Sequence, residues 1–448
     1  MPTSTAVGAS HLGGSDQGGS DQGGSDHGGS APPGLVLAPF RALRYAAAGD
    51  DLAVMTSPPY DVIDENQRIQ LEAASPHNVV RLILPRDDAG PGSRYRRVAA
   101  TLGAWRRSGV LRRDPEPALY VYQESVDGHV QRGLLGALGL TPIEAGIVLP
   151  HENTMAGPVA DRLALTEATS ANLEPIFLVY EGGGPASELV RSAEKADPLV
   201  SIATDDGVEH RLWRVTEPAE IAAVQADLLP RRAVIADGHH RYATYLRHQQ
   251  DRHRAGDGPG PWDSGLAYLV DSAAFGPQVH AIHRTVAGLP VERAAALAGR
   301  GFRVDPLPGG LDAALSELAA AGAAGVTFVL VGGGRAFLLT EPRADLIEAA
   351  VPRNRAPAWR SLDVTVAHRL LIGELWELLD DESTVGFAHD ARTAVAAAER
   401  DGGTALLLNP TPVEAVAAVA AVGERMPRKS TLFTPKPRTG LLLRPFEA

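Results

Sequence analysis

Apolar residues in the first part of the chain gather into short runs that are bounded by polar and turn-forming residues. Runs of this length predict β-strands, whereas apolar residues at helical spacing predict amphipathic helices. We expect strands at 79–84, 118–123, 133–140, 146–149 and 175–180, and helices at 65–73, 94–108 and about 161–171.

The pattern becomes regular between residues 209 and 250. A strand is followed by a helix at 217–228, a buried strand at 231–236 and a second helix. The Gly- and Pro-rich segment 252–262 then interrupts this pattern, which is typical of a domain boundary or a long loop.

Beyond residue 262, Ala- and Val-rich helices alternate with apolar strands. We expect strands at 326–331, 336–339 and 404–408, and helices at 291–299, 311–321, 362–379, 391–400 and 413–426. The triple glycine 332–334 lies between two apolar runs and no helix follows it, so it predicts a hairpin turn rather than a dinucleotide-binding loop. Strands interleaved with helices predict a mixed α/β (α+β) fold.

The N-terminal segment has a different character. Residues 13–30 repeat a five-residue unit of glycine, serine and polar residues, which offers nothing to bury. Such a segment predicts a flexible tail, and the tail's two histidines, His11 and His27, are more typical of a solvated spacer than of a metal site. It lacks the basic and apolar regions of a secretory signal, so we expect a cytoplasmic protein. The chain then divides into a tail (1–34), a first domain (35–255) and a C-terminal α/β domain (256–448).

Composition narrows the possible functions. The 448 residues carry 42 Lys+Arg against 54 Asp+Glu, a net charge of −12, which disfavours non-specific nucleic-acid binding. There is no cysteine, so disulfides, Cys-zinc sites and thiol chemistry are excluded. No run of about 18 apolar residues is present, which argues against a membrane-spanning helix. The P-loop, nucleophile-elbow and dinucleotide-binding motifs are also absent, and His151-Glu152 lacks the second histidine of a zinc protease.

The sharpest candidate site is the segment 236–242, ADGHHRY. A buried strand runs into Asp237 and Gly238, and a helix begins at His239 and His240. This arrangement points backbone N–H groups and the positive end of the helix dipole outward, as an anion site requires. Arg241 adds a bidentate phosphate donor. The alternative is that Asp237 only caps the helix and the histidines are ordinary surface groups.

Two further segments could supply catalytic groups. In SPPYDV, two prolines hold an extended backbone and present Tyr60 and Asp61, although Asp61 could equally be a turn residue before the next helix. In LPHENT, His151 and Glu152 could supply a general base or a metal ligand. The nearby Asp161-Arg162 pair could add a cation, or could be an ion pair on a helix face. No metal ligand set is identified by these motifs alone.

Lysine usage marks a fourth segment, MPRKSTLFTPK. The chain has only three lysines, and two of them, Lys429 and Lys436, lie here. Where arginine is the usual cation, a lysine indicates a position that favours a compact point charge. With Ser430 and Thr431 between them, the lysines predict a phosphate or carboxylate clamp, the alternative being a basic C-terminal loop.

PPYDVI, LPHENT with the following Asp-Arg, NLEPIF, ADGHHRYAT and MPRKSTLFTPKPRTGL together resemble the DUF-1015 family, over about 35–445. Its members are often labelled chromosome-partition (SpoOJ/ParA/ParB/repB) proteins. The DGHHR segment is also similar to the phosphate motif of the ParB/sulfiredoxin-like superfamily, which includes free-serine kinases. The resemblance implies a phosphate-binding core of that type with large insertions, followed by the C-terminal α/β domain.

The function implied is phosphoryl transfer between a nucleotide (ADP or ATP) and serine or phosphoserine, in either direction, with Mg²⁺ as the second cofactor. The resemblance carries over directly to Asp237, His239, His240 and Arg241 and to Gly238 between them. For the upstream acid of these kinases, Glu152 and Asp61 are both candidates.

Two other functions remain open. A nucleotide-switched, ParB-like DNA-binding protein would need a helix-turn-helix and a basic face, neither of which is visible. A metabolite-binding regulator would keep the phosphate site without turnover. The sequence does not determine the oligomeric state.

Overall fold

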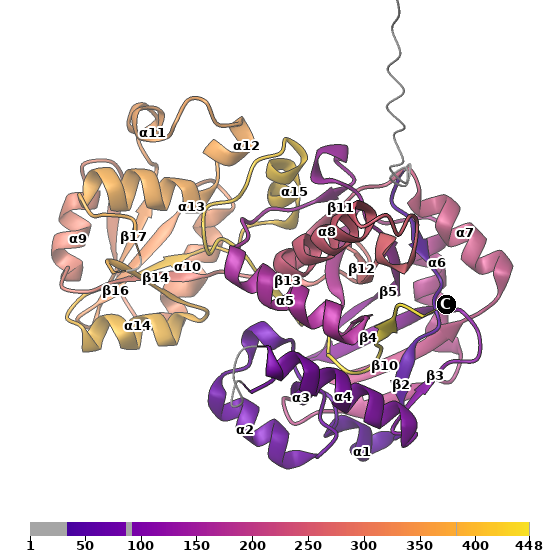
Figure 1. Ribbon diagram of the computed structural model, residues 1–448. Coiled ribbons are helices and arrows are strands. Elements are labelled where there is room, and N and C mark those ends of the chain that lie inside the picture. Colours follow the sequence, from indigo (N-terminus) through magenta and orange to yellow (C-terminus); the bar gives the residue numbers. More distant parts are fainter. Residues whose placement is uncertain (1–33, 87–91, 382, 448) are drawn as a thin grey trace, which may run out of the picture.

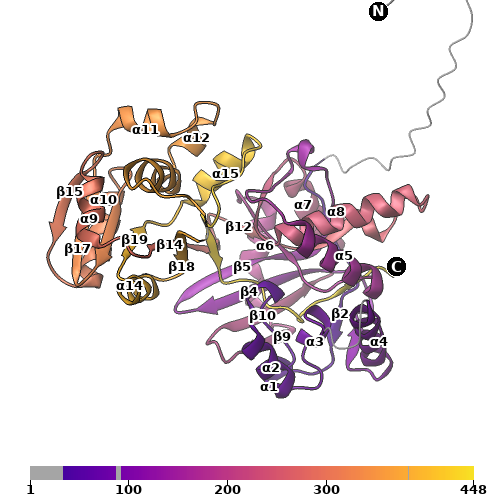
Figure 2. The same ribbon diagram turned by 60° about the vertical axis from the view of Figure 1, so that its left-hand side comes forward.

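The computed structural model describes residues 34–86, 92–381 and 383–447, and the predicted N-terminal tail lies outside them. Within these ranges the chain forms a nine-stranded sheet and a six-stranded sheet, each covered by helices. Figures 1 and 2 show the two sheets side by side, with the C-terminal segment, in yellow, returning from the smaller unit to the larger one. The predicted mixed α/β class is confirmed.

The nine-stranded sheet has the strand order β6-β11-β8-β12-β5-β4-β10-β9, and β1 also pairs with β5. Most neighbours are antiparallel, but β11 runs parallel to β6, and β12 runs parallel to β8. Its strands are β1 (Leu37–Ala38), β4 (Leu119–Val126), β5 (His129–Gly139), β6 (Val148–Leu149), β8 (Ile176–Tyr180), β9 (Val200–Ala203), β10 (Glu209–Val215), β11 (Ala233–Asp237) and β12 (Ser264–Asp271).

Alternating side chains of these strands enter two different cores. Phe177 and Val179 of β8 join the cluster that includes α4 (Ser93–Arg107) and α5 (Ala156–Thr169). Ile176 and Leu178 of the same strand join the cluster under α6 (Pro185–Ser192), α7 (Pro218–Leu228) and α8 (His239–Arg254). Because successive residues of a strand face opposite sides of a sheet, a wholly apolar strand is buried on both faces.

The six-stranded sheet is antiparallel throughout, in the order β15-β17-β16-β19-β14-β18. It consists of β14 (His283–Val286), β15 (Arg303–Leu307), β16 (Phe328–Gly332), β17 (Arg335–Thr340), β18 (Val385–Ala388) and β19 (Thr404–Leu408). Helices α10 (Leu311–Gly322) and α14 (Ala391–Arg400) pack on one face, and α9 (Val291–Ala298) packs on the other. Gly333 and Gly334 turn the β16–β17 hairpin with positive φ, which confirms the predicted turn.

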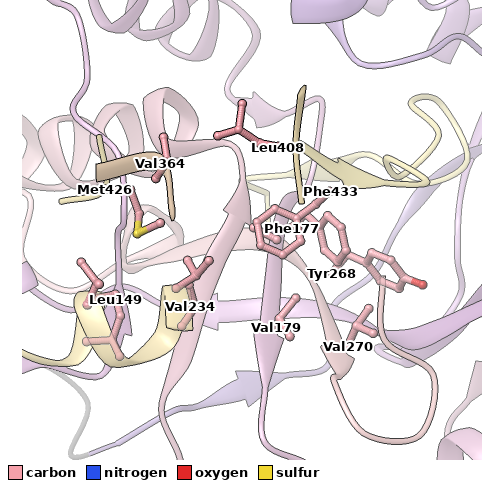
Figure 3. Packing of buried hydrophobic residues seen from close by; sticks show 14 of the residues in the cluster. Leu149, Phe177, Val179, Val234, Tyr268, Val270, Val364, Leu408, Met426 and Phe433 are labelled. Carbon is pink, nitrogen blue, oxygen red and sulfur yellow. The ribbon is translucent and has the colours of Figure 1, made fainter. Parts of the chain in front are cut away.

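The C-terminal segment ties the two units together. After α15 (Val413–Ala421) the chain forms β20 (Leu432–Thr434), which pairs with β13 (Gln278–His280). Further on, β21 (Arg444–Pro445) pairs with β7 (Ala171–Asn172). Figure 3 shows Met426 and Phe433 of this segment among side chains of both units, including Val234, Phe177 and Leu408. This packing carries residues 426–445 back over the larger unit.

The predicted boundary near residue 255 falls between α8 and β12, two elements of the same unit. The division of the chain into domains stays a prediction. The remaining strands and α-helices are β2 (Leu43–Tyr45), β3 (Leu111–Arg113), α1 (Gly49–Ala53), α2 (Glu65–Ala74), α3 (Val80–Ile83), α11 (Ala344–Ala350), α12 (Pro357–Arg360) and α13 (Asp363–Val366). A π-helix spans Ala367–Leu375, and short 3₁₀ helices lie at Tyr60–Val62, Ile143–Ala145, Ala193–Lys195 and Pro261–Asp263.

The strand predicted at 79–84 is wrong, because this segment forms the short helix α3. Asn78 explains the difference. Its side-chain oxygen accepts a hydrogen bond from the amide of Val80, and its amide group donates to the carbonyls of Val54 and Thr56. The two tertiary contacts hold Asn78 in place, and its local bond to Val80 starts a helix that the β-branched composition alone does not favour.

No helix in the described part of the chain combines the length and the apolar character needed to cross a bilayer.

Candidate functional site

The turn from β11 into α8 forms the centre of the candidate site. Asp237 ends the strand, Gly238 has φ 94°, and the helix begins at His239. A side chain at Gly238 would be strained by this φ and would meet Arg241 Nε at 3.1 Å and Ile176 Cα at 3.3 Å. No side chain caps the N-terminus of α8. The first-turn N–H groups of a 16-residue helix therefore remain available to an anion.

Asp237 is held between two cations from distant parts of the sequence. One oxygen accepts a hydrogen bond from Arg241, one turn along α8, and the other lies 2.5 Å from Lys436 Nζ. Burial raises the pKa of Asp237, but Arg241 and Lys436 outweigh it, so the pKa lies below its ordinary value. Asp237 is thus an ionised group that positions two positive charges beside the helix N-terminus.

The SPPYDV segment contributes to the same place. Asp61 Oδ2 lies 3.5 Å from Lys436 Nζ. The Tyr60 ring packs against two guanidinium groups, with the Cζ of Arg162 at 4.2 Å and that of Arg241 at 6.0 Å from its centroid. Burial raises the pKa of Tyr60 to about 12, although both arginines oppose this shift. Tyr60 therefore acts as a neutral aromatic wall beside two cations.

Glu174 belongs to this network, and our sequence reasoning did not select it. Its carboxylate accepts a hydrogen bond from the Tyr60 amide at 3.0 Å and lies 3.7 Å from Arg162 Nη1. Burial raises its pKa, with Arg241 and Arg162 opposing. The signal was present, because Glu174 is the one charged residue in NLEPIF, just before a buried strand. A charge in such a position needs partners.

A second cluster lies next to the helix start and consists of His151, Glu152, His239 and Thr431. The two imidazole rings are T-shaped with centroids 4.5 Å apart, and Thr431 Oγ1 lies 3.0 Å from His151 Nε2. His239 Nδ1 is 3.7 Å from the Glu152 carboxylate. Burial lowers the pKa of His151 to about 4 and that of His239 well below its ordinary value. Both rings are therefore neutral at pH 7.

The hydrogen bonds of this cluster bear on whether it could hold a metal. His151, Glu152 and His239 offer ligand atoms that all lie within 4.8 Å of one another. However, His239 Nε2 accepts a hydrogen bond from the His151 amide at 3.2 Å, so the proton of the neutral ring is on Nδ1, facing Glu152. A metal on Nδ1 would require the opposite tautomer and would lose this bond. The cluster fits proton transfer better than metal binding.

Glu152 is the carboxylate of this region that is suited to accept a proton. Its side chain is 43% exposed, and its contacts with His151 and His239 are 4.0 and 3.7 Å long. Partial burial raises its pKa, the charge of Asp237 adds to this effect, and Lys429 and Lys436 oppose it. A cavity of about 110 Å³ borders Glu152 and His239, which leaves room for a small reacting group.

The remaining predicted residues are less central. His240 Nε2 accepts a hydrogen bond from the Met155 amide at 3.1 Å. Ser430 donates its hydroxyl proton to the Pro427 carbonyl within its own loop. Lys429, at φ 53°, has its carbonyl bound by Arg284 and influences Glu152 through its charge. Of the two predicted clamp lysines, only Lys436 forms an ion pair with Asp237. The catalytic and phosphate-binding roles of all these residues stay predictions.

Comparisons with known proteins give one strong match and several weak ones. No curated protein sequence matches this chain. A mutant of a free serine kinase, in complex with ADP, aligns at 13% identity and TM-score 0.32, covering 69% of this chain and 91% of the kinase. SbnI from Staphylococcus aureus aligns at 10% identity and TM-score 0.33, with 69% and 87% covered. A conserved hypothetical protein from Pyrococcus furiosus aligns at 13% identity and TM-score 0.30, with 67% and 89% covered.

A family model matches far more directly. The model for "Protein of unknown function (DUF1015)" covers residues 37–365, which include the SPPYDV, LPHENT, NLEPIF and ADGHHRY segments. The chain belongs to the DUF1015 family.

Proposed function

We propose that this protein transfers a phosphoryl group between a nucleotide, ADP or ATP, and the hydroxyl group of a small amino acid, serine or phosphoserine. The observation that carries the proposal is the convergence of Arg241 and Lys436 on Asp237 at the uncapped N-terminus of α8. Phosphoryl transfer needs mainly positioning and positive charge around the phosphate, and this site supplies both. The similarity of ADGHHRYAT to the phosphate motif of free-serine kinases supports serine as the acceptor.

Each residue has a distinct task in this proposal. The first-turn amides of α8 and the Gly238 backbone hold the phosphate, since Gly238 allows an oxygen to approach closely. Arg241 is anchored by Asp237 and by the Pro175 carbonyl, so its guanidinium is preorganised. Lys436 adds a compact charge from the opposite side.

Glu152 accepts the proton of the acceptor hydroxyl. Its raised pKa brings it closer to neutrality, where a general base works best. His239 Nδ1–H faces this carboxylate and orients it. In the reverse direction the protonated Glu152 returns the proton to the serine oxygen.

Magnesium, when bound, would neutralise charge on the phosphates of the nucleotide. Both oxygens of Asp237 are bonded to cations, so Asp237 does not fit as a magnesium ligand. Asp61 has one contact of 3.5 Å to Lys436, and Glu152 has only longer contacts. Since Glu152 is assigned to proton transfer, Asp61, which retains acceptor capacity, would hold the ion.

Phosphorus NMR of the full chain with Mg²⁺ tests the proposal. One sample contains serine with ATP or ADP, and the other contains phosphoserine with ADP or AMP. We expect the phosphoserine signal to appear or disappear, and Lys436→Gln to slow this change by at least about tenfold. Lys195→Gln is the matched control, because Lys195 lies far along the chain in a short 3₁₀ turn and takes no part in the site.

An unchanged phosphorus spectrum in both samples would contradict phosphoryl transfer to serine. Turnover that is unaffected in Lys436→Gln would place the reaction elsewhere on the molecule.

A further inference from the structure

A second cavity, of about 350 Å³, lies where the C-terminal segment passes between the two units. Its walls combine Asn153 from the larger unit, His368 and Arg369 from the π-helix, and Met426 and Arg428 from the returning segment. None of these residues forms part of the ion-paired group around Asp237. The cavity is therefore separate from the ion-paired group around Asp237 and could bind a different ligand.

Positive charge is in excess in this cavity. Among the described residues that line it are four arginines and two aspartates: Arg355, Arg369, Arg425, Arg428, Asp380 and Asp381. The chain as a whole has a net charge of −12. A positive cavity in an acidic protein is a local arrangement that concentrates anions.

Two of the arginines are compensated and two are not. Arg428 Nη2 lies 3.2 Å from Asp380, and Arg355 Nη1 lies 3.6 Å from Glu424. Arg425 has only 3.4 Å contacts to the carbonyls of Gly423 and Glu424, and burial lowers its pKa. Arg369 is exposed and has no hydrogen-bond or ion-pair partner among the described residues.

The cavity wall is stiffened by a buried chain of hydrogen bonds. Asp380 accepts from His368 Nδ1 at 2.8 Å, and His368 Nε2 accepts from Arg284 Nε at 3.0 Å. Arg284 is 1% exposed and also donates to the Lys429 carbonyl at 3.0 Å. This buried guanidinium adds positive potential behind the wall while it holds the loop in place.

The chemistry of the lining favours phosphate groups over a nucleobase. Guanidinium groups bind phosphate oxygens in bidentate fashion. The aromatic residue of the lining, Trp359, is 4% exposed and its ring is covered by Arg355, 5.0 Å from the ring centroid. It therefore offers no free face for stacking. Arg369 and Arg425, which have no carboxylate partner among the described residues, outweigh the one remaining carboxylate of the lining, Asp381, so the cavity favours an anion.

We propose that this cavity binds a phosphoanhydride chain through Arg369 and Arg425, as in inorganic pyrophosphate or the diphosphate of a nucleotide. Arg425 and Asn153 also line the smaller cavity beside Glu152, so the two sites adjoin. Binding here is independent of phosphoryl transfer at Asp237.

Calorimetric titration of the full chain with inorganic pyrophosphate, at low salt and without Mg²⁺, tests this site. We expect binding that weakens by about tenfold or more in Arg369→Gln and in Arg425→Gln, since each removes a charge-assisted contact. Arg293→Gln is the matched control, because Arg293 is exposed on α9 and far from the cavity wall in the sequence. Glu152→Gln should also keep the affinity, which separates this site from the catalytic one.

Pyrophosphate binding that is absent from the wild type, or unchanged in both arginine variants, would overturn the assignment. Arg369 is exposed, so its variant should fold even if Arg425→Gln does not. Displacement of pyrophosphate by ADP would identify the ligand as a nucleotide diphosphate. Pyrophosphate that ADP does not displace would identify a free polyphosphate, and both results support the cavity.

Discussion

The two units of this protein bury charge very differently. The nine-stranded unit encloses ionised or ionisable groups at many points, among them Glu124, Arg132, Glu174, Asp237 and Arg241. In the described residues 283–408 of the six-stranded unit, the buried ionisable residues are His283, Arg284 and His368. Two of these three connect to the loop that returns to the larger unit.

This difference indicates that the groups able to take part in a reaction are concentrated in the larger unit. A buried charge is costly unless it is paired and hydrogen-bonded, so a fold retains such groups where something beyond stability requires them. The larger unit keeps paired charges at the end of β11. The smaller unit has an apolar, Ala- and Val-rich core, and contributes through Arg284 and the arginine-lined cavity.

The largest expected effect is that of Asp237→Asn. This change leaves Arg241 and Lys436 without their shared counter-charge in a buried site, so we expect the free energy of unfolding to fall by about 3 kcal/mol. Chemical denaturation measures it. Asp305→Asn in the six-stranded unit removes an exposed ion pair with Arg303 and should cause no measurable change. If both variants lost the same free energy of unfolding, the two units would not differ in how much their stability depends on a paired charge.

Lys436→Gln should affect ligand binding more than stability. It removes one of two cations at the proposed phosphate site but leaves Asp237 paired with Arg241. We expect the affinity for ADP to fall by roughly tenfold while most of the stability remains. Titration with ADP measures the affinity, and Lys195→Gln is the control.

Glu152→Gln tests the proposed role of Glu152 as proton acceptor. Because the pKa of Glu152 is raised by partial burial and by Asp237, turnover should increase as the pH rises through that pKa, where the carboxylate becomes free to accept a proton. The variant should lose roughly 100-fold in kcat together with this limb of the profile. Glu144→Gln changes an exposed carboxyl of the same unit and should leave the profile intact. A pH profile that survives in Glu152→Gln would assign the base to another residue.

A pH-dependent effect on stability is expected at Glu124. Burial raises its pKa to about 8, whereas the unfolded chain has the ordinary value of 4.5. Between these values the folded state binds more protons than the unfolded state, so the contribution of Glu124 to stability is greatest below pH 4.5 and is lost as the pH rises from 4.5 to about 8. Thermal unfolding of Glu124→Gln from about pH 5 to 9 should show a flatter curve than the wild type. Glu209→Gln, on the exposed side of β10, should keep the wild-type slope.

The smallest effect is expected at the surface of the six-stranded unit. Arg392 pairs with Asp312 at 2.9 Å, but both side chains are more than three-quarters exposed. Solvent screens such pairs, so Arg392→Gln should leave the melting temperature unchanged within error. A clear decrease would show that the smaller unit depends on surface charge more than its apolar core indicates.

Local features were predictable because their causes lie within a few residues. The strand-to-helix turn at Asp237–Gly238 and the hairpin at Gly333–Gly334 require glycine at positive φ, and the sequence displays it there. The helices at 94–108 and 391–400 follow from apolar spacing and appear as α4 and α14. The strand predicted at 79–84 was wrong for the opposite reason. The contacts that hold Asn78 at the start of helix α3 come from Val54 and Thr56, which are distant in the sequence.

By itself, then, the sequence determined the mixed α/β class, the strand-to-helix turn before α8 and the residues that could carry chemistry. Tertiary structure alone decided which of them meet. Lys436 reaches Asp237 only because Met426, Phe433 and strand β20 carry the C-terminal segment back across the larger unit. The arginine-lined cavity arises in the same way, from segments that have no local pattern in common. The backbone conformation of a segment depends mainly on its own residues and near neighbours. Which distant charges form pairs depends on how the whole chain packs around its core.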